Sequence, residues 1–106
     1  MFAEWSQPIE KVDDALRLVE ASYERQTSAF LIEARLLPAE FFELRTRFAG
    51  DFVQKLVNYG LRVALVAPNA ASHGERFAEF AAELVRNPVV PIFAERSEAE
   101  AWLAAV

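Results

Sequence analysis

The sequence VALVA at residues 63–67 decides the fold class, because a run of consecutive apolar residues leaves no polar face for solvent. Two similar runs are AFLI at residues 29–32 and VVPIFA at residues 89–94. None of the three alternates with polar residues, as a strand with one solvated face would. Such runs are typical of parallel strands that helices cover. Pro91 cannot donate to a hydrogen-bond ladder, so we expect the third run at the edge of the sheet.

Helical patterns separate these runs. The first predicted helix covers residues 11–25, and its apolar residues recur at steps of three and four, which places them on one face. That predicted core-facing stripe consists of Val12, Leu16, Val19 and Tyr23.

Further helices follow the second and third strands. One is predicted over residues 48–59, where Gly60 is a suitable C-terminal cap. The next begins at a capping box headed by Ser72 and stops at Asn87, and a short last helix begins at a second box headed by Ser97 and runs to the end of the chain. The predicted apolar face of the third helix consists of Phe77, Phe80, Ala81, Leu84 and Val85.

Strands and helices therefore alternate along the chain, which indicates right-handed crossovers and an α/β fold. We expect a single domain over residues 1–106, with a small, mostly parallel or mixed sheet of three to five strands and about four helices. Residues 1–5 are expected to add a short edge strand, although five residues carry little periodic signal. If that edge is open, the domain has a physical reason to pair with a second copy of itself.

The composition narrows the function classes. The chain has no cysteine and a single histidine, which argues against disulfides, thiolate chemistry and multi-histidine metal sites, and we expect no metal or cofactor. The net charge is −5 and the arginines are scattered among acids, so nucleic acid and anionic membranes are not expected partners. No apolar run approaches the length of a transmembrane helix, and we expect no signal peptide, because the residues after Met1 are acidic and interrupted. We therefore expect a cytoplasmic protein.

A family resemblance adds to these expectations. The segments that carry it are DAL at 14–16, FFEL at 41–44, AGD at 49–51, QK at 54–55, NY at 58–59, the pair Phe77 and Phe80, Ala99, and WL at 102–103. From about Val12 to Leu103 the chain resembles the bacterial "domain of unknown function 4180" family, a STAS-like domain. The resemblance implies a STAS-like fold with helices packed mainly on one side of the sheet. It implies no known reaction.

Thr46 is a candidate phosphoacceptor by the same resemblance, since STAS domains of the anti-sigma-factor-antagonist type carry a phosphorylatable hydroxyl before a helix. Arg45 and Arg47 stand where that type has a carboxylate and a small glycine. A phosphate on Thr46 would lie at a helix N-terminus, where free N–H groups favour an anion. The alternative is that Thr46 is simply the N-cap of the helix.

The polar face of the helix over residues 48–59 is a candidate partner-binding surface. It carries Asp51, Gln54, Lys55 and Asn58, and Asp51 and Lys55 are spaced to form a surface ion pair. The alternative is a solvated face without a partner. Tyr59 either extends this surface or belongs to the core, with its hydroxyl bound to the backbone.

A second set of polar residues follows the predicted strands. Glu33 and Arg35 come after the first run, and they are expected to pair with each other or with Arg62. Asn69 and His73 come after the second run. Ligands gather at the carboxyl ends of strands in open α/β sheets, so these residues are candidates for a small-molecule site. The alternative is an ordinary loop and a solvated ion pair.

Aromatic residues raise the question of a contact surface. Phe41 and Phe42 are adjacent, so both cannot face one core from a single helical turn, and one is expected to point outward or into an interface. Phe2 and Trp5 raise the same question. The alternative is that the domain's own loops cover them.

Three hypotheses of function follow. The first is a non-enzymatic regulatory or protein-interaction domain, expected to be a homodimer, with an unidentified protein partner and, if Thr46 is modified, a separate kinase. The second is a small-molecule-binding domain at the carboxyl ends of the strands. A small enzyme has the least support, because no nucleophile or paired carboxylates can be placed.

Overall fold

Strands and helices alternate along the chain in the computed structural model, which describes residues 2–105. Short 3-10 turns (η) connect several of them. The strands are β1 (Ala3–Glu4), β2 (Ala29–Glu33), β3 (Arg62–Val66) and β4 (Ile92–Phe93). The helices are α1 (Ala15–Arg25), α2 (Phe48–Asn58), α3 (Glu75–Leu84) and α4 (Arg96–Ala104). The 3-10 turns are η1 (Val12–Asp14), η2 (Ala34–Leu36), η3 (Ala39–Phe42), η4 (Leu44–Thr46) and η5 (Ala70–His73).

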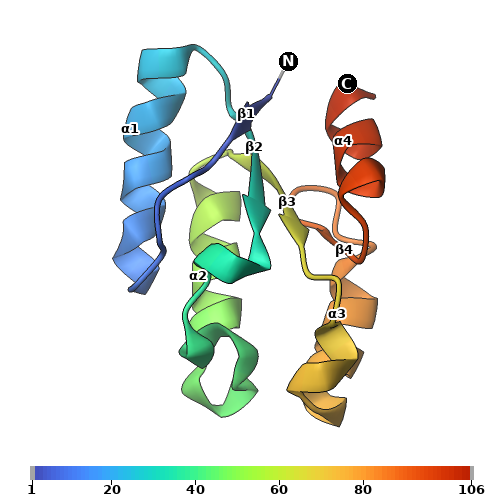
Figure 1. Cartoon of the computed structure of the whole chain (residues 1–106). Helices are drawn as coiled ribbons and strands as arrows, with labels where there is room; N and C mark the ends of the chain where they lie inside the picture. Colours follow the sequence, from blue (N-terminus) through green and yellow to red (C-terminus); the bar gives the residue numbers. More distant parts are fainter. Residues whose placement is uncertain (1, 106) are drawn as a thin grey trace.

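The four strands form one parallel sheet in the order β1-β2-β3-β4 (Figure 1). Phe30 of β2 pairs with Ala3 on one side and Val63 on the other. The short first strand and the position of β4 at an edge are confirmed. The third apolar run is longer than the strand it contains. Strand β4 begins only at Ile92, directly after Pro91.

The helices cover the two faces of the sheet unequally, which confirms the predicted arrangement. Helices α1, α2 and α3 pack on one face, and α4 packs on the other (Figure 1). Phe30 and Leu65 point into the three-helix core, whereas Leu31 and Ala64 point towards α4. The runs are therefore apolar throughout because both faces of each central strand are buried. Trp5 is buried in the larger core.

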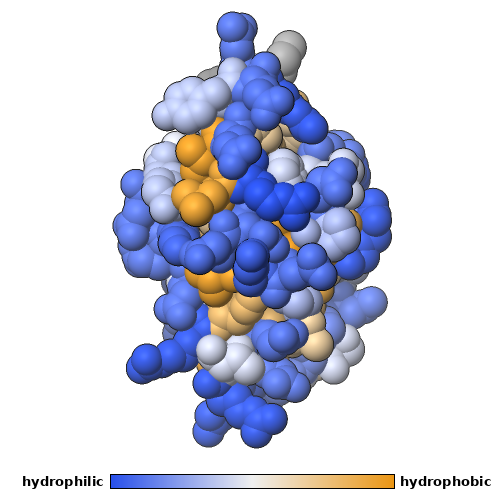
Figure 2. Space-filling view, turned by 90° about the vertical axis from the view of Figure 1, so that its left-hand side faces the viewer, coloured by the Kyte–Doolittle hydropathy of each residue, from blue (hydrophilic) through white to orange (hydrophobic). Residues whose placement is uncertain are grey.

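The buried face of α1 differs from the predicted one. Residues 11–25 do not form one helix: η1 precedes α1, which begins at Ala15. Ala15, Leu18 and Ala21 face the core, while Leu16 is 42% exposed and Tyr23 is 80% exposed. Apolar side chains consequently reach the surface on the face that α1 forms (Figure 2).

Asp14 explains this difference. Its carboxylate is buried and accepts hydrogen bonds from the N–H groups of Glu10, at 2.8 Å, and Lys11, at 3.1 Å. The side chain must therefore point inward, towards the segment that leads into α1. Because Asp14 directly precedes the helix, its orientation places Leu18 on the buried side and turns Leu16 outward.

The predicted capping boxes are also wrong. Ser72 lies in η5, where its hydroxyl donates to the carbonyl of Asn69 at 2.6 Å, and α3 begins after Gly74, whose φ of 102° suits glycine. Ser97 is already inside α4, which begins at Arg96. The predicted end of α2 is confirmed, with a left-handed Gly60. Val106, placed in the last helix by its sequence pattern, lies outside the described residues.

Val85 departs from the predicted apolar face of α3. It is 44% exposed, and Phe80 is only partly buried, whereas the rest of that face is buried. Among residues 2–105 no helix is long and apolar enough to cross a membrane.

Candidate functional site

The segment between β2 and α2 forms one wall of a surface groove. Its turns η3 and η4 are held together by Thr46, whose Oγ1 lies 2.7 Å from the carbonyl oxygens of both Glu40 and Glu43. The same hydroxyl accepts a hydrogen bond from the N–H of Phe48 at 3.2 Å. Thr46 is exposed, yet its hydroxyl is hydrogen-bonded to backbone groups of η3, of Glu43 between the two turns and of the start of α2.

The prediction that Thr46 is the N-cap of α2 is wrong by one residue. Arg47 occupies that position with a left-handed φ of 65°. Thr46 nevertheless satisfies the first N–H of the helix, which is the role that a capping hydroxyl usually has. Modification of Thr46 stays a prediction.

Aromatic rings form the floor of the groove. Phe41 is fully buried in the core, and Phe42 is only partly buried, so the adjacent pair is divided between core and surface. Phe42 stacks on His73 with ring centroids 3.9 Å apart and planes 16° apart. The rings of Phe77 and Phe42 meet edge to face, with centroids 5.0 Å apart. The ring centroid of Phe80 lies 5.9 Å from that of Phe77.

Two adjoining hollows of about 380 and 390 Å³ make up the groove, and both are bordered by Leu44, Arg45 and Arg76. We call the combined surface the aromatic groove. The first hollow is lined by Phe42, Glu43, Leu44, Arg45, His73, Gly74, Glu75, Arg76 and Phe77. The second is lined by Leu44, Arg45, Arg76, Glu79, Phe80 and Glu83.

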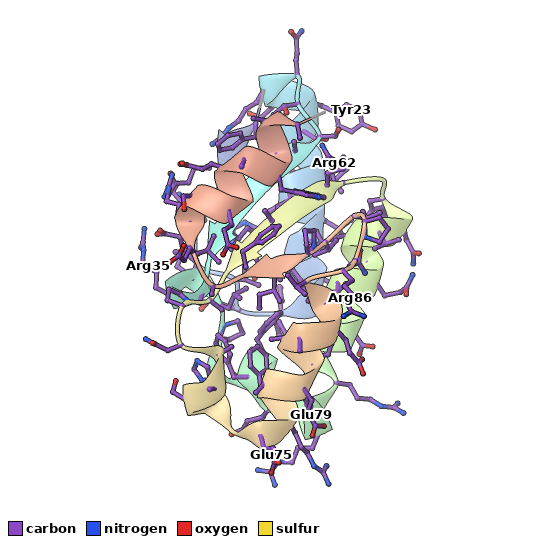
Figure 3. The ribbon with its side chains drawn as sticks, turned by 90° about the vertical axis from the view of Figure 1, so that its right-hand side faces the viewer. Tyr23, Arg35, Arg62, Glu75, Glu79 and Arg86 are labelled. Carbon is purple, nitrogen blue, oxygen red and sulfur yellow. The ribbon has the colours of Figure 1, made fainter. Side chains whose placement is uncertain are left out.

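The rim of the aromatic groove carries both signs of charge. Arg45 lies 3.9 Å from Glu43, and both side chains are largely exposed. Glu79 of α3 projects from the opposite wall (Figure 3). An apolar floor with a charged rim is the usual anatomy of a protein-binding surface.

His73 contributes a flat ring to this floor. Its ring contacts the rings of Phe42 and Phe77, and its ring nitrogens make no hydrogen bond with any residue between 2 and 105. A general base is usually oriented by a second polar group. Nothing in the described part of the chain orients His73 in this way. Nor do residues 2–105 contain a group of three carboxylate or imidazole side chains that could hold a metal ion.

The polar face of α2 lies elsewhere, beside α1. The predicted ion pair between Asp51 and Lys55 is wrong, because Lys55 instead binds the carboxylate of Asp13 in η1. This hydrogen bond lowers the pKa of Asp13 and raises the pKa of Lys55. Gln54 donates to Asn58 at 2.8 Å.

Tyr59 is not a core residue, since it is 43% exposed. It ends the α2 face and leaves an aromatic ring accessible there. The role of this face in partner binding stays a prediction.

The polar residues at the carboxyl ends of the strands do not form one site. Glu33 and Arg35 pair at 3.1 Å, as predicted, and line a hollow of about 200 Å³ together with Pro68. His73 lies instead in the aromatic groove, and Asn69 lines neither hollow.

The alternative prediction, that Arg62 pairs with Glu33 or Arg35, is wrong. Arg62 begins β3 and pairs in register with Ala29, so it lies at the other end of the parallel sheet. Its guanidinium lies 4.2 Å from the centre of the Trp102 ring of α4.

An unpredicted cluster centres on Arg96, at the start of α4. Its guanidinium binds Glu4 at the end of β1, at 2.6 Å, Glu33 at the end of β2, at 3.3 Å, and Glu100 one turn further along α4, at 2.9 Å. The hydrogen bond from Arg96 lowers the pKa of Glu4, and Glu4 and Glu100 raise the pKa of Arg96. These contacts tie the edge strand to α4.

Sequence reasoning identified parts of the aromatic groove but not the whole. It singled out Phe42 and His73 separately, and it missed Leu44, Arg76 and the outward position of Phe80. The signal that could have joined them is the aromatic content of both segments, since aromatic residues far apart in sequence often meet in one cluster.

In the described residues the fold is thus an α/β domain with an all-parallel, four-stranded sheet, and its surface carries the aromatic groove. The chain matches the family described as "Domain of unknown function (DUF4180)" over residues 1–103, and it belongs to that family. Neither a curated protein nor a solved structure matches the chain.

Proposed function

We propose that this chain is a non-enzymatic protein-interaction domain, and that the aromatic groove binds an exposed segment of a partner protein. The observation that carries the proposal is the half-buried Phe42 on the floor of the groove, which stacks on His73 and lines the first of the two adjoining hollows. Aromatic residues in a desolvated pocket with a polar rim commonly dominate binding energies at interfaces.

The chemistry of the floor favours an apolar anchor. Leu44 and Phe80 are partly buried and border the second hollow, so an aliphatic or aromatic side chain of the partner would gain apolar contact there. Arg76 and Glu79 on the rim would select against segments with unmatched charges.

The small-molecule alternative has less support. Its expected residues are divided between two hollows, with Glu33 in one and His73 in the other. A ligand pocket usually surrounds most of its ligand and brings several polar groups together.

Thr46 offers a route for regulation of the same groove. Its hydroxyl bonds to Glu40 and Glu43 hold the two turns of the wall, and a phosphate on that oxygen would remove its donor proton. The partly buried Leu44 lies in the same wall. A kinase that modified Thr46 would thereby change the shape of the aromatic groove.

Peptides selected from a random displayed library provide the test. We expect selected peptides to carry bulky apolar residues, and we expect their binding to shift the amide resonances of Leu44, Arg76 and Phe80. Leu44→Glu should weaken binding by at least tenfold, because it places a charge on the apolar surface.

Gln54→Glu on α2 is the matched control, since it introduces the same charge on the other candidate surface. It should leave peptide affinity unchanged. Peptides whose binding depended on Gln54 and not on Leu44 would overturn the proposal in favour of the α2 face.

A further inference from the structure

The two edges of the sheet differ in how well they are protected, and the β4 edge is the open one. Residues 89–93 run beside β3. The carbonyl oxygens of Val89, Pro91 and Phe93 accept hydrogen bonds at 3.0, 2.9 and 2.8 Å from two residues of β3 and from Ala67 just after it. In an extended chain the backbone groups of successive residues point to opposite sides. The N–H and C=O of Ile92 therefore point away from the sheet.

No residue between 2 and 105 bonds to those outward groups of Ile92. Proline often protects an edge strand because it lacks an N–H group. Pro91 cannot do so here, since its carbonyl binds β3 and its nitrogen faces the same way. The missing donor lies inside the sheet, and the outer edge keeps its full hydrogen-bonding capacity.

The β1 edge is already covered. Both edge strands are two residues long, but at β1 the side chain of Arg25 donates to the outward carbonyl of Glu4 at 3.4 Å. Of the two edges, β4 is therefore the better template for another strand.

An apolar groove lies directly beside β4. It has a volume of about 320 Å³, and no charged or polar side chain lines it. Figure 3 shows β4 crossing the front of the molecule between α3 and α4. The lining residues that matter here are Ala78, Ala82, Val85 and Ile92. Ala78 and Ala82 of α3 and Val85, directly after its end, recur at helical spacing, and Val85 is 44% exposed.

We infer that the occupant of this edge is a second copy of the chain, paired antiparallel through β4 on a two-fold axis at Ile92. On such an axis the two Ile92 residues exchange both of their N–H···O bonds, and the two sheets become one. The two α3 helices then run antiparallel on the same face. The small side chains Ala78 and Ala82 let these helices approach closely.

Charges along α3 are complementary in this arrangement. Glu75 and Glu79 lie towards the start of the helix, and Arg86 lies just beyond its end (Figure 3). None of the three forms an ion pair with another residue in the described range 2–105. An antiparallel helix pair brings the end of one helix beside the start of the other, so Arg86 of one copy faces Glu79 of the second copy, and the reverse.

This dimer leaves most of the aromatic groove open. Arg76 and Phe80 border the aromatic groove on one side of α3, whereas Ala78 and Ala82 border the β4 groove on the other. Glu79 also lines the second hollow of the aromatic groove, so it is the residue that the two surfaces share. The inference therefore does not rest on the proposed function, and a dimer would present two aromatic grooves.

Sedimentation equilibrium of the whole chain tests the inference. We expect a mass twice the 11.9 kDa of the chain. Ala82→Arg places like charges against each other at the axis and should raise the dimer dissociation constant on the order of a hundredfold. Arginine forms helices well and residue 82 is exposed, so the fold should persist. Ala101→Arg, at an exposed position of α4, is the matched control and should leave the dimer intact.

A charge exchange tests the orientation. Arg86→Glu and Glu79→Arg should each weaken the dimer, and the double variant should restore it, because both pairs across the axis are re-formed. Hydrogen exchange at Ile92 should be slow in the dimer and fast in Ala82→Arg. A monomeric wild type, a dimer unaffected by Ala82→Arg, or a double variant without restored dimerisation would each overturn the inference.

Discussion

Replacement of Asp14 by alanine should destabilise the domain far more than replacement of an exposed aspartate would. Asp14 is 5% exposed, and its carboxylate accepts two backbone hydrogen bonds, from Glu10 and Lys11. Hydrogen bonds to charged groups contribute about 1.5–3 kcal/mol each. Both donors are partly open to water, so the lower figure applies, and Asp14→Ala should cost about 3 kcal/mol.

Urea and thermal unfolding followed by circular dichroism measure this cost. For a domain of this size about 1 kcal/mol corresponds to roughly 4–8 °C in Tm, so we expect a fall of roughly 12 °C or more. Both hydrogen bonds end on Oδ2, so the amide oxygen of Asp14→Asn can accept both of them without the charge, and this variant should lose about half as much. Asp13→Ala is the neighbouring control, because it removes only a surface contact with Lys55. Equal losses for Asp13→Ala and Asp14→Ala would refute the assignment of a structural role to Asp14.

Three further predictions concern other parts of the fold. Hydrogen bonds from Arg96 lower the pKa of Glu4, so this contact stabilises the fold above the usual glutamate pKa of about 4.3. The stabilisation is lost as pH falls through the lower pKa of Glu4 in the folded state. Arg96→Gln should therefore reduce the dependence of unfolding free energy on acidic pH in urea titrations, and an unchanged dependence would contradict this. Phe41→Ala should cost about 3–5 kcal/mol by calorimetry, whereas Phe42→Ala, at the half-exposed position, should cost clearly less; equal costs would place Phe42 in the core. Thr46→Glu should remain folded but change peptide affinity, and identical affinities would count against regulation at Thr46.

The sheet could be predicted because its signal is local. Residues 29–32 and 63–67 are apolar on every position, and only burial on both faces explains that pattern. Pro91 placed the third run at an edge, since a proline lacks the N–H group that a strand with two neighbours needs for its ladder. The family match over residues 1–103 agrees with the resemblance, which rests on short segments between residues 14 and 103.

The face of α1 could not be predicted from hydrophobic spacing. The apolar stripe through Leu16 and Tyr23 has better periodicity than the observed buried face, which uses Ala15 and Leu18. The buried carboxylate of Asp14 determines which face of α1 is buried. Its hydrogen bonds to backbone N–H groups depend on positions that no periodicity reveals. The same limit applies to Lys55, whose partner Asp13 lies 42 residues away, rather than one helical turn away.

The aromatic groove was beyond sequence reasoning for a similar reason. Phe42 and His73 come from turns on either side of a helix and a strand, and they meet only after the sheet has formed. Neither residue has an unusual local pattern. Only the three-dimensional arrangement shows that their rings stack and remain accessible.

The affinity of library-selected peptides for Leu44→Glu, measured by calorimetry beside Gln54→Glu, tests the role of the aromatic groove most directly. We expect at least a tenfold loss for Leu44→Glu and no change for Gln54→Glu. Equal affinities for the wild type and Leu44→Glu would contradict the proposal that the aromatic groove is the binding surface.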